Sequence, residues 1–171
     1  SEMCIETDTL LNRQPKKSRK IFVCLDEQRG QYLVDGLVAM DFPLSSGVKA
    51  YPTKTGDYAV ISKKEDHTSN LYGKMYDAEG KCINYNAEST DPVPEGGRFD
   101  GSPMPYWQRL TNAGLGLHVG KVRRHPVSHG CVRLPRNVAE ILYRQTSIGT
   151  PVTIRKTPLP VPEAQKVPAV Q

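Results

Sequence analysis

Short apolar runs separated by turn residues open the patterned part of the chain. Residues 21–25 read Ile-Phe-Val-Cys-Leu and are followed by a polar stretch at 26–30, which is typical of a buried strand that ends in a turn. The runs at 31–34 and 37–40 flank Asp35-Gly36, a dipeptide that favours positive backbone φ and therefore a tight type I′ hairpin. The pattern predicts one strand followed by a β-hairpin.

Further segments are rich in β-branched and aromatic residues and are bounded by Gly, Pro, Asp or Asn. Such bounded runs are typical of short strands. They lie at residues 58–61, 71–76, 82–85, 115–119 and 152–154. Together with the hairpin they predict a mostly-β fold without internal repeats.

One segment has the spacing of a helix. Asn137 is a suitable N-cap residue, Glu140 follows three residues later, and Val138, Ile141 and Leu142 fall on one face. We therefore expect one helix from about residue 137, with few short helices elsewhere.

The remaining segments define the domain boundaries. A chain of 171 residues suits one compact domain with short tails. Residues 1–18 are polar and residues 158–171 are rich in proline, so we expect a flexible N-terminal segment, a domain at 19–157 and an extended tail. Residues 86–105 have neither strand nor helix period, and so long a connection predicts a functional loop or lid.

Composition and charge argue against several classes of protein. Hydrophobic residues make up 37% and charged residues 24% of the chain, as in ordinary globular proteins. The net charge of +5 includes basic runs at 16–20 and 121–124, but no zinc-finger spacing or aromatic RNA-binding signature accompanies them, so no nucleic-acid partner is expected. No apolar stretch reaches the roughly 20 residues of a membrane span, and residues 1–4 lack the layout of a secretory signal, which leaves the compartment open.

The cysteines are scattered along the chain. Cys4, Cys24, Cys82 and Cys131 form no Cys-x-x-Cys pair, so neither a zinc ribbon nor a thioredoxin-like motif is indicated. Cys24 and Cys82 lie in or beside apolar runs and are expected to be buried structural thiols. The disulfide status of Cys4, Cys24 and Cys82 stays open.

A cluster of histidine, glycine and cysteine carries the candidate chemistry. Residues 114–120 read Gly-Leu-Gly-Leu-His-Val-Gly, and residues 128–135 read Ser-His-Gly-Cys-Val-Arg-Leu-Pro. A thiol with a pKa of about 8.5 is mostly protonated at neutral pH, so a nucleophilic Cys131 needs a base such as His118. Gly130 permits an unusual backbone dihedral, and amides next to the thiol can form an oxyanion hole, in which each donor is worth about 3 kcal/mol. The cluster favours acyl transfer over redox chemistry.

This pattern resembles the catalytic domain of L,D-transpeptidases, the YkuD family. The family signature is an upstream histidine, a variable loop, Ser/Thr-His-Gly-Cys and a following Arg or Asn, which His118, residues 128–131 and Arg133 match. The resemblance extends over residues 19 to 156, because three upstream segments are also similar: 20–25 to the first strand, 51–58 to the Thr-rich segment, and 104–107 to the stretch before the catalytic histidine.

The chain also departs from the family pattern. The gap before Ser128 is short, residues 123–125 are basic, and Lys54 stands within the Thr-rich segment. These departures bear on substrate preference more than on reaction type.

The resemblance implies a fold and a set of roles. The fold is a YkuD-like β-sandwich or pair of mixed sheets, with one helix after the catalytic cysteine. Cys131 attacks, His118 takes its proton, the main-chain carbonyl of Val119 orients the imidazole, and the amides of Gly130 and Cys131 hold the oxyanion. Arg133 stabilises the site or binds a substrate carboxylate, for which a guanidinium is well suited. The residues expected to shape the pocket or contact substrate are Arg133, Ser128, His129, Tyr106, Trp107 and Met104.

The resemblance also implies an activity. Cys131 would attack a carbonyl of a peptidoglycan stem peptide, release the terminal D-amino acid, and pass the acyl group from the thioester to an amine of a neighbouring stem, in a 3-3 or 1-3 cross-link. Stem peptides would be the partners, carbapenems would acylate the thiol, and the setting would be periplasmic or otherwise extracytoplasmic. No metal or other cofactor is implied. The oligomeric state is not indicated.

Several alternatives remain open. His129 lies two residues from Cys131 and could serve as the base in place of His118, which in turn could be a core histidine. Zinc could be bound by His118, His125, His129 and Cys131, although the helical His-Glu-x-x-His layout is missing. Water as acceptor would make an L,D-carboxypeptidase or a cell-wall toxin, and a vestigial motif would leave a wall-binding module. Tyr106 and Trp107 could be plain core, and His125 and His67 are expected to be exposed loop residues.

Overall fold

Two five-stranded sheets and one helix make up the regular structure of residues 17–157, the part of the chain that the computed structural model describes. The first sheet has the order β3-β2-β1-β10-β4. Its strands are β1 (Arg19–Cys24), β2 (Arg29–Val34), β3 (Leu37–Pro43), β4 (Gly56–Ala59) and β10 (Pro151–Arg155). β1 and β10 run parallel, and the other neighbours run antiparallel.

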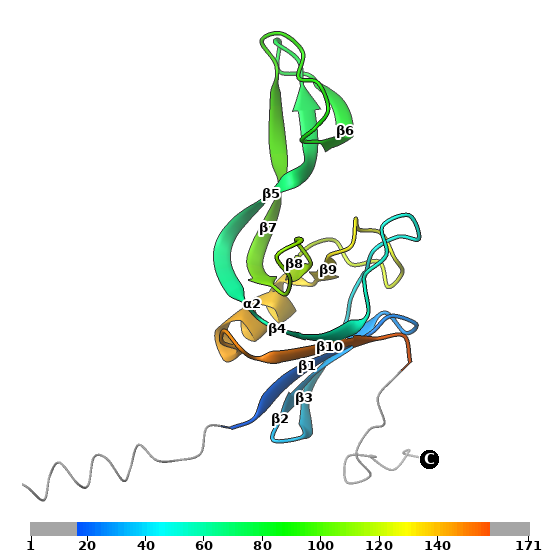
Figure 1. Ribbon diagram of the computed structural model, residues 1–171, viewed down its shortest axis with the longest axis vertical. Coiled ribbons are helices and arrows are strands. Elements are labelled where there is room, and N and C mark those ends of the chain that lie inside the picture. The colour runs from blue at the N-terminus through cyan, green and yellow to red at the C-terminus, as the bar shows by residue number, and fades with distance from the viewer. Residues whose placement is uncertain (1–16, 158–171) are drawn as a thin grey trace, which may run out of the picture.

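The second sheet has the order β6-β5-β7-β8-β9. Its strands are β5 (Ser62–Tyr76), β6 (Cys82–Glu88), β7 (Arg98–Arg109), β8 (Gly116–Val119) and β9 (Val132–Leu134). β8 and β9 are parallel, whereas β5, β6 and β7 form an antiparallel ribbon that rises away from the first sheet, with β6 near its tip (Figure 1). The prediction of a mostly-β fold with two mixed sheets and one helix after Cys131 is confirmed over the described residues.

The hairpin predicted at Asp35-Gly36 is present. Val34 pairs with Leu37, and the two turn residues have φ of 51° and 78°, as a type I′ turn requires. Asp35 also fixes the start of β1, because its amide donates to the Ser18 carbonyl and its carboxylate accepts from the Ser18 amide. The other predicted strands all overlap observed ones, but the strand predicted at 71–76 is only the end of β5, which begins nine residues earlier at Ser62.

The long loop predicted at residues 86–105 is wrong. β6 continues to Glu88 and β7 begins at Arg98, so the connection covers only residues 89–97. β7 accommodates Pro103 and Pro105 because β8 pairs only with Gln108 and Arg109, which leaves the earlier part of β7 with a strand on one side alone.

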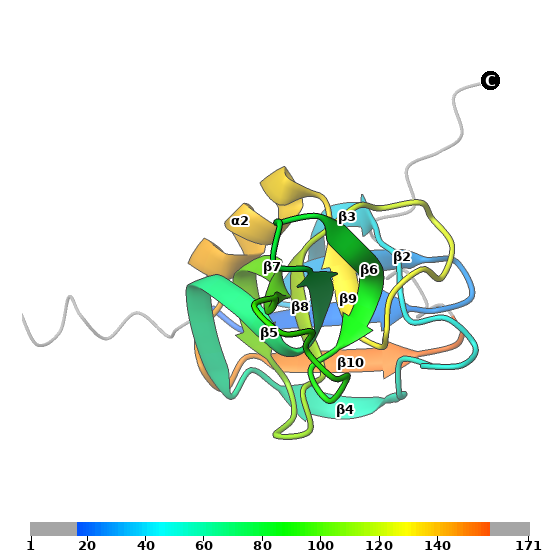
Figure 2. The ribbon, with the colours of Figure 1, turned by 90° about the horizontal axis from the view of Figure 1, so that it is seen from above.

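The helix α2 (Arg136–Gln145) packs against β7 and β8 on one flank of the second sheet (Figure 2). The predicted cap at Asn137 is wrong: the N-cap position is Pro135, and no side chain caps the helix. Proline has no amide hydrogen and disfavours a helical backbone in the residue before it, so the helix begins directly after Pro135. The buried face consists of Val138, Ala139 and Leu142, whereas Ile141 is 45% exposed.

One core joins the sheets and the helix. Its buried side chains include Ile21, Val23, Val152 and Ile154 from the first sheet, Leu117, Val132 and Leu134 from the second, and Val138 and Leu142 from α2. Cys24 and Cys82 do not belong to it, because both thiols are only half-buried and unpaired. The expectation that these two cysteines are buried is therefore wrong. The predicted tails at residues 1–18 and 158–171 lie outside the described residues, except for residues 17 and 18.

Candidate active site

The register of β7, β8 and β9 arranges the candidate residues in rows. Leu117 pairs with Gln108 on one side and with Val132 on the other, and all three side chains are buried in the core. Because neighbouring positions along a strand point to opposite faces, the rows before and after this one face away from the core. The first outer row is Arg109, Gly116 and Cys131; the second is Trp107, His118 and Arg133.

The side chains of these two rows line a cleft of about 770 Å³. Cys131, His118, Arg133, Trp107 and Arg109 all contribute to its wall. Of the other expected site residues, the cleft also includes Ser128, His129, Gly130, Val119 and Met104. Tyr106 is the one expected substrate-binding residue that the structure does not place there.

The Cys131 thiol is largely enclosed. Its Sγ donates a hydrogen bond to the Gly114 carbonyl at 3.2 Å. Burial raises the pKa of the Cys131 thiol, and the Gly116 amide, Arg109 and Arg133 oppose this shift because each favours the thiolate. The resting group is therefore a thiol that is surrounded by groups ready to stabilise its anion.

His118 is held in one tautomer. It is 6% exposed, and its Nδ1 lies 2.6 Å from the Val119 carbonyl. Because a carbonyl can only accept, Nδ1 carries the hydrogen and Nε2 keeps its lone pair. Burial lowers the pKa of His118 to about 4, with Arg133 and His67 adding to the shift and the Val119 bond opposing it. The imidazole is neutral at physiological pH and can accept a proton at Nε2.

The Ser-His-Gly-Cys turn is fixed by its own hydrogen bonds and by a distant segment. Ser128 Oγ donates to the Cys131 carbonyl at 2.5 Å and accepts from the Gly130 amide at 3.1 Å. Thr53 Oγ1 donates to the Gly130 carbonyl at 2.6 Å and accepts from the Gly47 amide at 2.8 Å. Gly130 has φ of 123°, a backbone conformation that favours glycine. The Gly130 amide, expected to face the oxyanion, is thus engaged by Ser128.

His129 lies between two tyrosine rings at the cleft. It stacks on Tyr72 with ring centroids 4.4 Å apart and touches Tyr51 at 4.9 Å. The Tyr51 hydroxyl donates to Glu88. Burial raises the pKa of Tyr72, with further contributions from Glu88, Tyr51 and Cys131. The aromatic contacts orient the His129 ring along Tyr72.

The cleft wall formed by β5 and β7 contains Trp107 and His67. The two rings stack with centroids 4.8 Å apart, and His67 lies in β5 opposite Met104. Burial, Arg109 and Lys64 lower the pKa of His67. The expectation that His67 is an exposed loop residue is therefore wrong, whereas His125 does lie exposed on the loop before the motif.

Tyr106 packs away from the cleft. Its φ of 53° interrupts the regular alternation of β7, and its ring makes an edge contact with Tyr143 of α2 at 5.4 Å. The prediction that Tyr106 contacts substrate is not supported by this placement, because the irregular backbone turns the ring toward the helix.

The sequence analysis did not place Arg109, Tyr72 or His67 at the cleft. Each lies far along the chain from the Ser-His-Gly-Cys motif. The period of two that places Trp107 and Arg109 on the same face of a strand was the available signal for Arg109. Tyr72 carried no comparable signal, because nothing in the sequence brings β5 next to residue 129.

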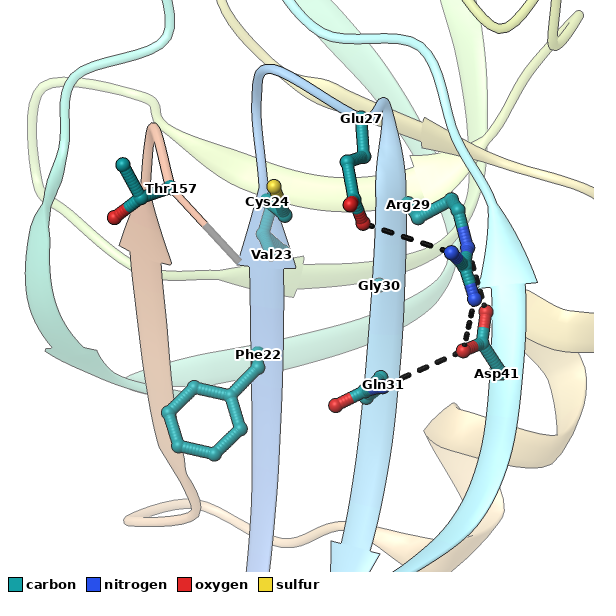
Figure 3. Close-up of a pocket in the computed structure, with 9 residues that line it drawn as sticks. All are labelled: Phe22, Val23, Cys24, Glu27, Arg29, Gly30, Gln31, Asp41 and Thr157. Carbon is teal, nitrogen blue, oxygen red and sulfur yellow. Dashed lines mark hydrogen bonds and ion pairs between the residues drawn. The ribbon is translucent and has the colours of Figure 1, made fainter. Parts of the chain in front are cut away.

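A second hollow of the molecule is small. It lies over β1, β2 and β3, has a volume of about 30 Å³, and is lined by Cys24 and the paired charges of Arg29, Asp41 and Glu27 (Figure 3). Hydrogen bonding to Asp41 raises the pKa of Arg29. The hollow has room for about one water, and its charges are already paired. It is therefore a weaker candidate for a functional site than the large cleft. Within residues 17–157, no three His, Cys, Asp or Glu side chains gather closely enough to hold a metal ion.

Comparison with protein families and curated proteins identifies relatives. Residues 18–154 match the family model of the YkuD L,D-transpeptidase catalytic domain. A probable L,D-transpeptidase 3 from Mycobacterium tuberculosis is 31% identical over 121 residues, which cover 67% of this chain and 38% of the relative.

Solved structures agree on the fold. An L,D-transpeptidase from Mycobacterium smegmatis superposes with a TM-score of 0.62 at 21% identity, covering 81% of this chain and 59% of that one. An Enterococcus faecium L,D-transpeptidase superposes with a TM-score of 0.58 at 28% identity, covering 81% and 50%. The chain spans roughly 38% to 59% of the length of these relatives.

Proposed function

Because this chain belongs to the YkuD family of L,D-transpeptidase catalytic domains, we propose that it is a cysteine-dependent acyltransferase acting on peptidoglycan stem peptides. The observation that carries the proposal is the placement of Cys131 and a neutral, Nδ1-anchored His118 in one cleft. Such a pair is what nucleophilic acyl transfer requires.

The first half-reaction forms a thioester. His118 Nε2 takes the proton of the Cys131 thiol as Sγ attacks the carbonyl of the third stem residue. The tetrahedral intermediate then collapses, the bond to the terminal D-amino acid breaks, and the departing amine receives the proton from His118. Since the thiol is raised in pKa and the imidazole lowered, proton transfer accompanies the attack instead of preceding it.

The surroundings support this step. The Val119 carbonyl keeps Nε2 in the basic tautomer, and the positive charges of Arg109 and Arg133 favour the anion on sulfur. The amides of Gly130 and Cys131 are proposed as oxyanion donors; for this, the Gly130 amide exchanges its bond to Ser128 Oγ for the substrate oxygen.

The second half-reaction decides the outcome. An amine of a neighbouring stem would resolve the thioester to give a 3-3 cross-link, or a 1-3 cross-link if a different donor bond is cleaved. Water as acceptor would instead give a tripeptide and make the protein an L,D-carboxypeptidase. Incubation with a purified tetrapeptide stem, followed by mass spectrometry, distinguishes a cross-linked dimer from a trimmed tripeptide.

The decisive variant is Cys131→Ala. It should abolish both products, and Cys24→Ala, which removes a half-buried thiol of the first sheet, should retain them. Full activity of Cys131→Ala would refute the mechanism. Absence of a carbapenem adduct on Cys131 would favour the non-catalytic alternative, a wall-binding module.

The proposed substrate lies outside the cytoplasm, so we propose a periplasmic or otherwise extracytoplasmic setting. The one helix within residues 17–157 lacks the length and apolar character needed to cross a membrane. The catalytic domain proposed at 19–157 corresponds closely to the family match at 18–154.

A further inference from the structure

Arg109 occupies a defined position relative to the nucleophile. It is the last residue of β7 and pairs with Gly116 of β8. The parallel register of β8 and β9 puts Cys131 on the other side of Gly116, and the hydrogen bond between the Gly116 amide and the Cys131 thiol agrees with this. Arg109 and Cys131 therefore stand at the two ends of one row, facing the cleft, and the residue between them has no side chain.

The guanidinium of Arg109 is oriented by neutral groups. It lies 5.3 Å from the centroid of the Trp107 ring, within the range of a cation–π contact, and its Nη1 donates to the Thr111 carbonyl at 3.4 Å. A Cβ on Gly116 would lie 2.4 Å from Cη2 of Trp107, so this glycine makes room for the ring that supports the guanidinium. Neither contact neutralises the charge.

The charge of Arg109 has no counter-ion in the described part of the chain. Arg29, Arg98, Arg144 and Arg155 each form an ion pair with an Asp or Glu, whereas the two cleft arginines, Arg109 and Arg133, do not within the described residues. Across residues 17–157, no carboxylate comes within 4.0 Å of the Arg109 guanidinium. Its field nevertheless reaches the cleft, since it acts on both Cys131 and His67.

We propose that Arg109 is a carboxylate-binding residue, and that it recognises the free α-carboxylate of the D-amino acid that leaves during acylation. The proposal rests on the proposed function. It assigns a role separate from that of Arg133, which lies in the neighbouring row with His118. A planar guanidinium that is oriented but unpaired is well suited to bidentate recognition of a carboxylate.

The spacing fits that carboxylate. Adjacent strands are about 4.8 Å apart, so the backbones of Arg109 and Cys131 are separated by about 10 Å. An extended peptide residue spans about 3.4 Å, and the long arginine side chain covers much of the remaining distance. The α-carboxylate of the terminal residue lies one residue beyond the attacked carbonyl, within this reach.

The first experiment measures the charge at the cleft without requiring any enzymatic activity. The full chain is alkylated with iodoacetate and, separately, with iodoacetamide, and the rate at Cys131 is followed by peptide-resolved mass spectrometry. Arg109→Gln should lower the ratio of the iodoacetate rate to the iodoacetamide rate about fivefold, and Arg109→Lys should retain most of this ratio. Losing the effect of Arg109 on the Cys131 thiolate slows both reagents alike, so that effect cancels in the ratio. Arg144→Gln, a paired surface arginine of α2, is the matched control. A ratio that changes no more in Arg109→Gln than in this control would overturn the proposal.

The second experiment tests which carboxylate is recognised. Tetrapeptide stems with a free C-terminal carboxylate or a C-terminal amide are compared as donors. The wild-type protein should prefer the acid about tenfold, through KM. Arg109→Gln should lose this preference, and any fall in kcat caused by the missing charge beside sulfur should be the same for both donors. An equal preference in both proteins, or a fall in kcat alone for both donors, would refute the assignment.

The two experiments separate this proposal from the proposed function. Loss of the alkylation ratio in Arg109→Gln, with no turnover of either peptide by the wild-type protein, would overturn the transpeptidase function and support a carboxylate site at Arg109. Turnover of both peptides without an effect of Arg109→Gln would support the function and overturn the proposal for Arg109.

Discussion

Replacing Thr53 by valine should both destabilise the protein and slow the reaction of Cys131. The Thr53 hydroxyl accepts from the Gly47 amide and donates to the Gly130 carbonyl, and within residues 17–157 no other side chain donates to that carbonyl. The side chain is 5% exposed, so water does not replace the lost hydroxyl. Valine has nearly the same shape, which restricts the change to the two hydrogen bonds.

The size of the effect follows from the two backbone groups left without a partner. Each unsatisfied buried group costs about 1–3 kcal/mol, so Thr53→Val should lose about 3 kcal/mol in the free energy of unfolding. For a chain of this length, that corresponds to a fall of roughly 6–12 °C in Tm. Because Gly130 directly precedes Cys131, the loosened turn should also lower the rate of Cys131 alkylation.

Thermal unfolding and iodoacetamide labelling of Cys131 provide the two measurements. Thr53→Ser is the matched control, since it keeps the hydroxyl and removes only a methyl group, and it should remain close to the wild-type protein in both assays. A Thr53→Val protein that melts with the serine variant and reacts at the wild-type rate would refute the idea that this hydroxyl fixes the Gly130 turn.

Three further predictions concern His118 and Gly116. With a His118 pKa of about 4, acylation of Cys131 by a carbapenem, followed by mass spectrometry, should lose rate only as the pH falls toward 4; a midpoint near 6.5 would contradict His118 as base. Because the unfolded histidine has a pKa of 6.5, the unfolded state binds more protons than the folded state between pH 4 and 6.5. The free energy of unfolding is therefore highest above about pH 6.5 and falls by up to about 3 kcal/mol toward pH 4. His118→Gln should flatten this pH dependence in urea unfolding. Gly116→Ala should lower the free energy of unfolding by about 1–3 kcal/mol, because its Cβ would lie 2.4 Å from Trp107. It should also shift the fluorescence emission of Trp107, the single tryptophan of the chain. Unchanged emission and stability would show that the ring is free to move.

Local patterns predicted the parts of the fold that local interactions determine. The Asp35-Gly36 turn follows from two residues that accept positive φ, and the strands around it follow from short apolar runs. The same reasoning misjudged residues 86–105, because this polar stretch has no period of two although β7 begins within it at Arg98. Pairing with β5 along one side decided that segment, and partners distant in sequence leave no local signature.

The candidate site likewise contains residues that a local sequence pattern identifies and residues that only strand pairing places there. Cys131, His118 and Arg133 belong to two nearby segments, and the family resemblance identified all three. Arg109 and His67 enter the cleft only through the register of β7 with its neighbours, and the irregular backbone at Tyr106 reverses which side chains face the cleft. A single residue of shift in register exchanges the two faces of a strand, so a prediction without the pairing could not assign these positions.

The electrostatics of the cleft indicate when its reactivity develops. Burial opposes charge on both partners, since it raises the pKa of the Cys131 thiol and lowers that of His118, and the resting pair is neutral. An enclosed thiolate–imidazolium pair would react with any electrophile that reached it, whereas a neutral pair develops charge only during attack on a bound carbonyl. In the proposed mechanism, Arg109 and Arg133 act on sulfur when it is most negative, because the same low-polarity surroundings that suppress ionisation at rest strengthen their attraction to the developing anion. Removing either positive charge should therefore slow acylation more than it alters the resting structure.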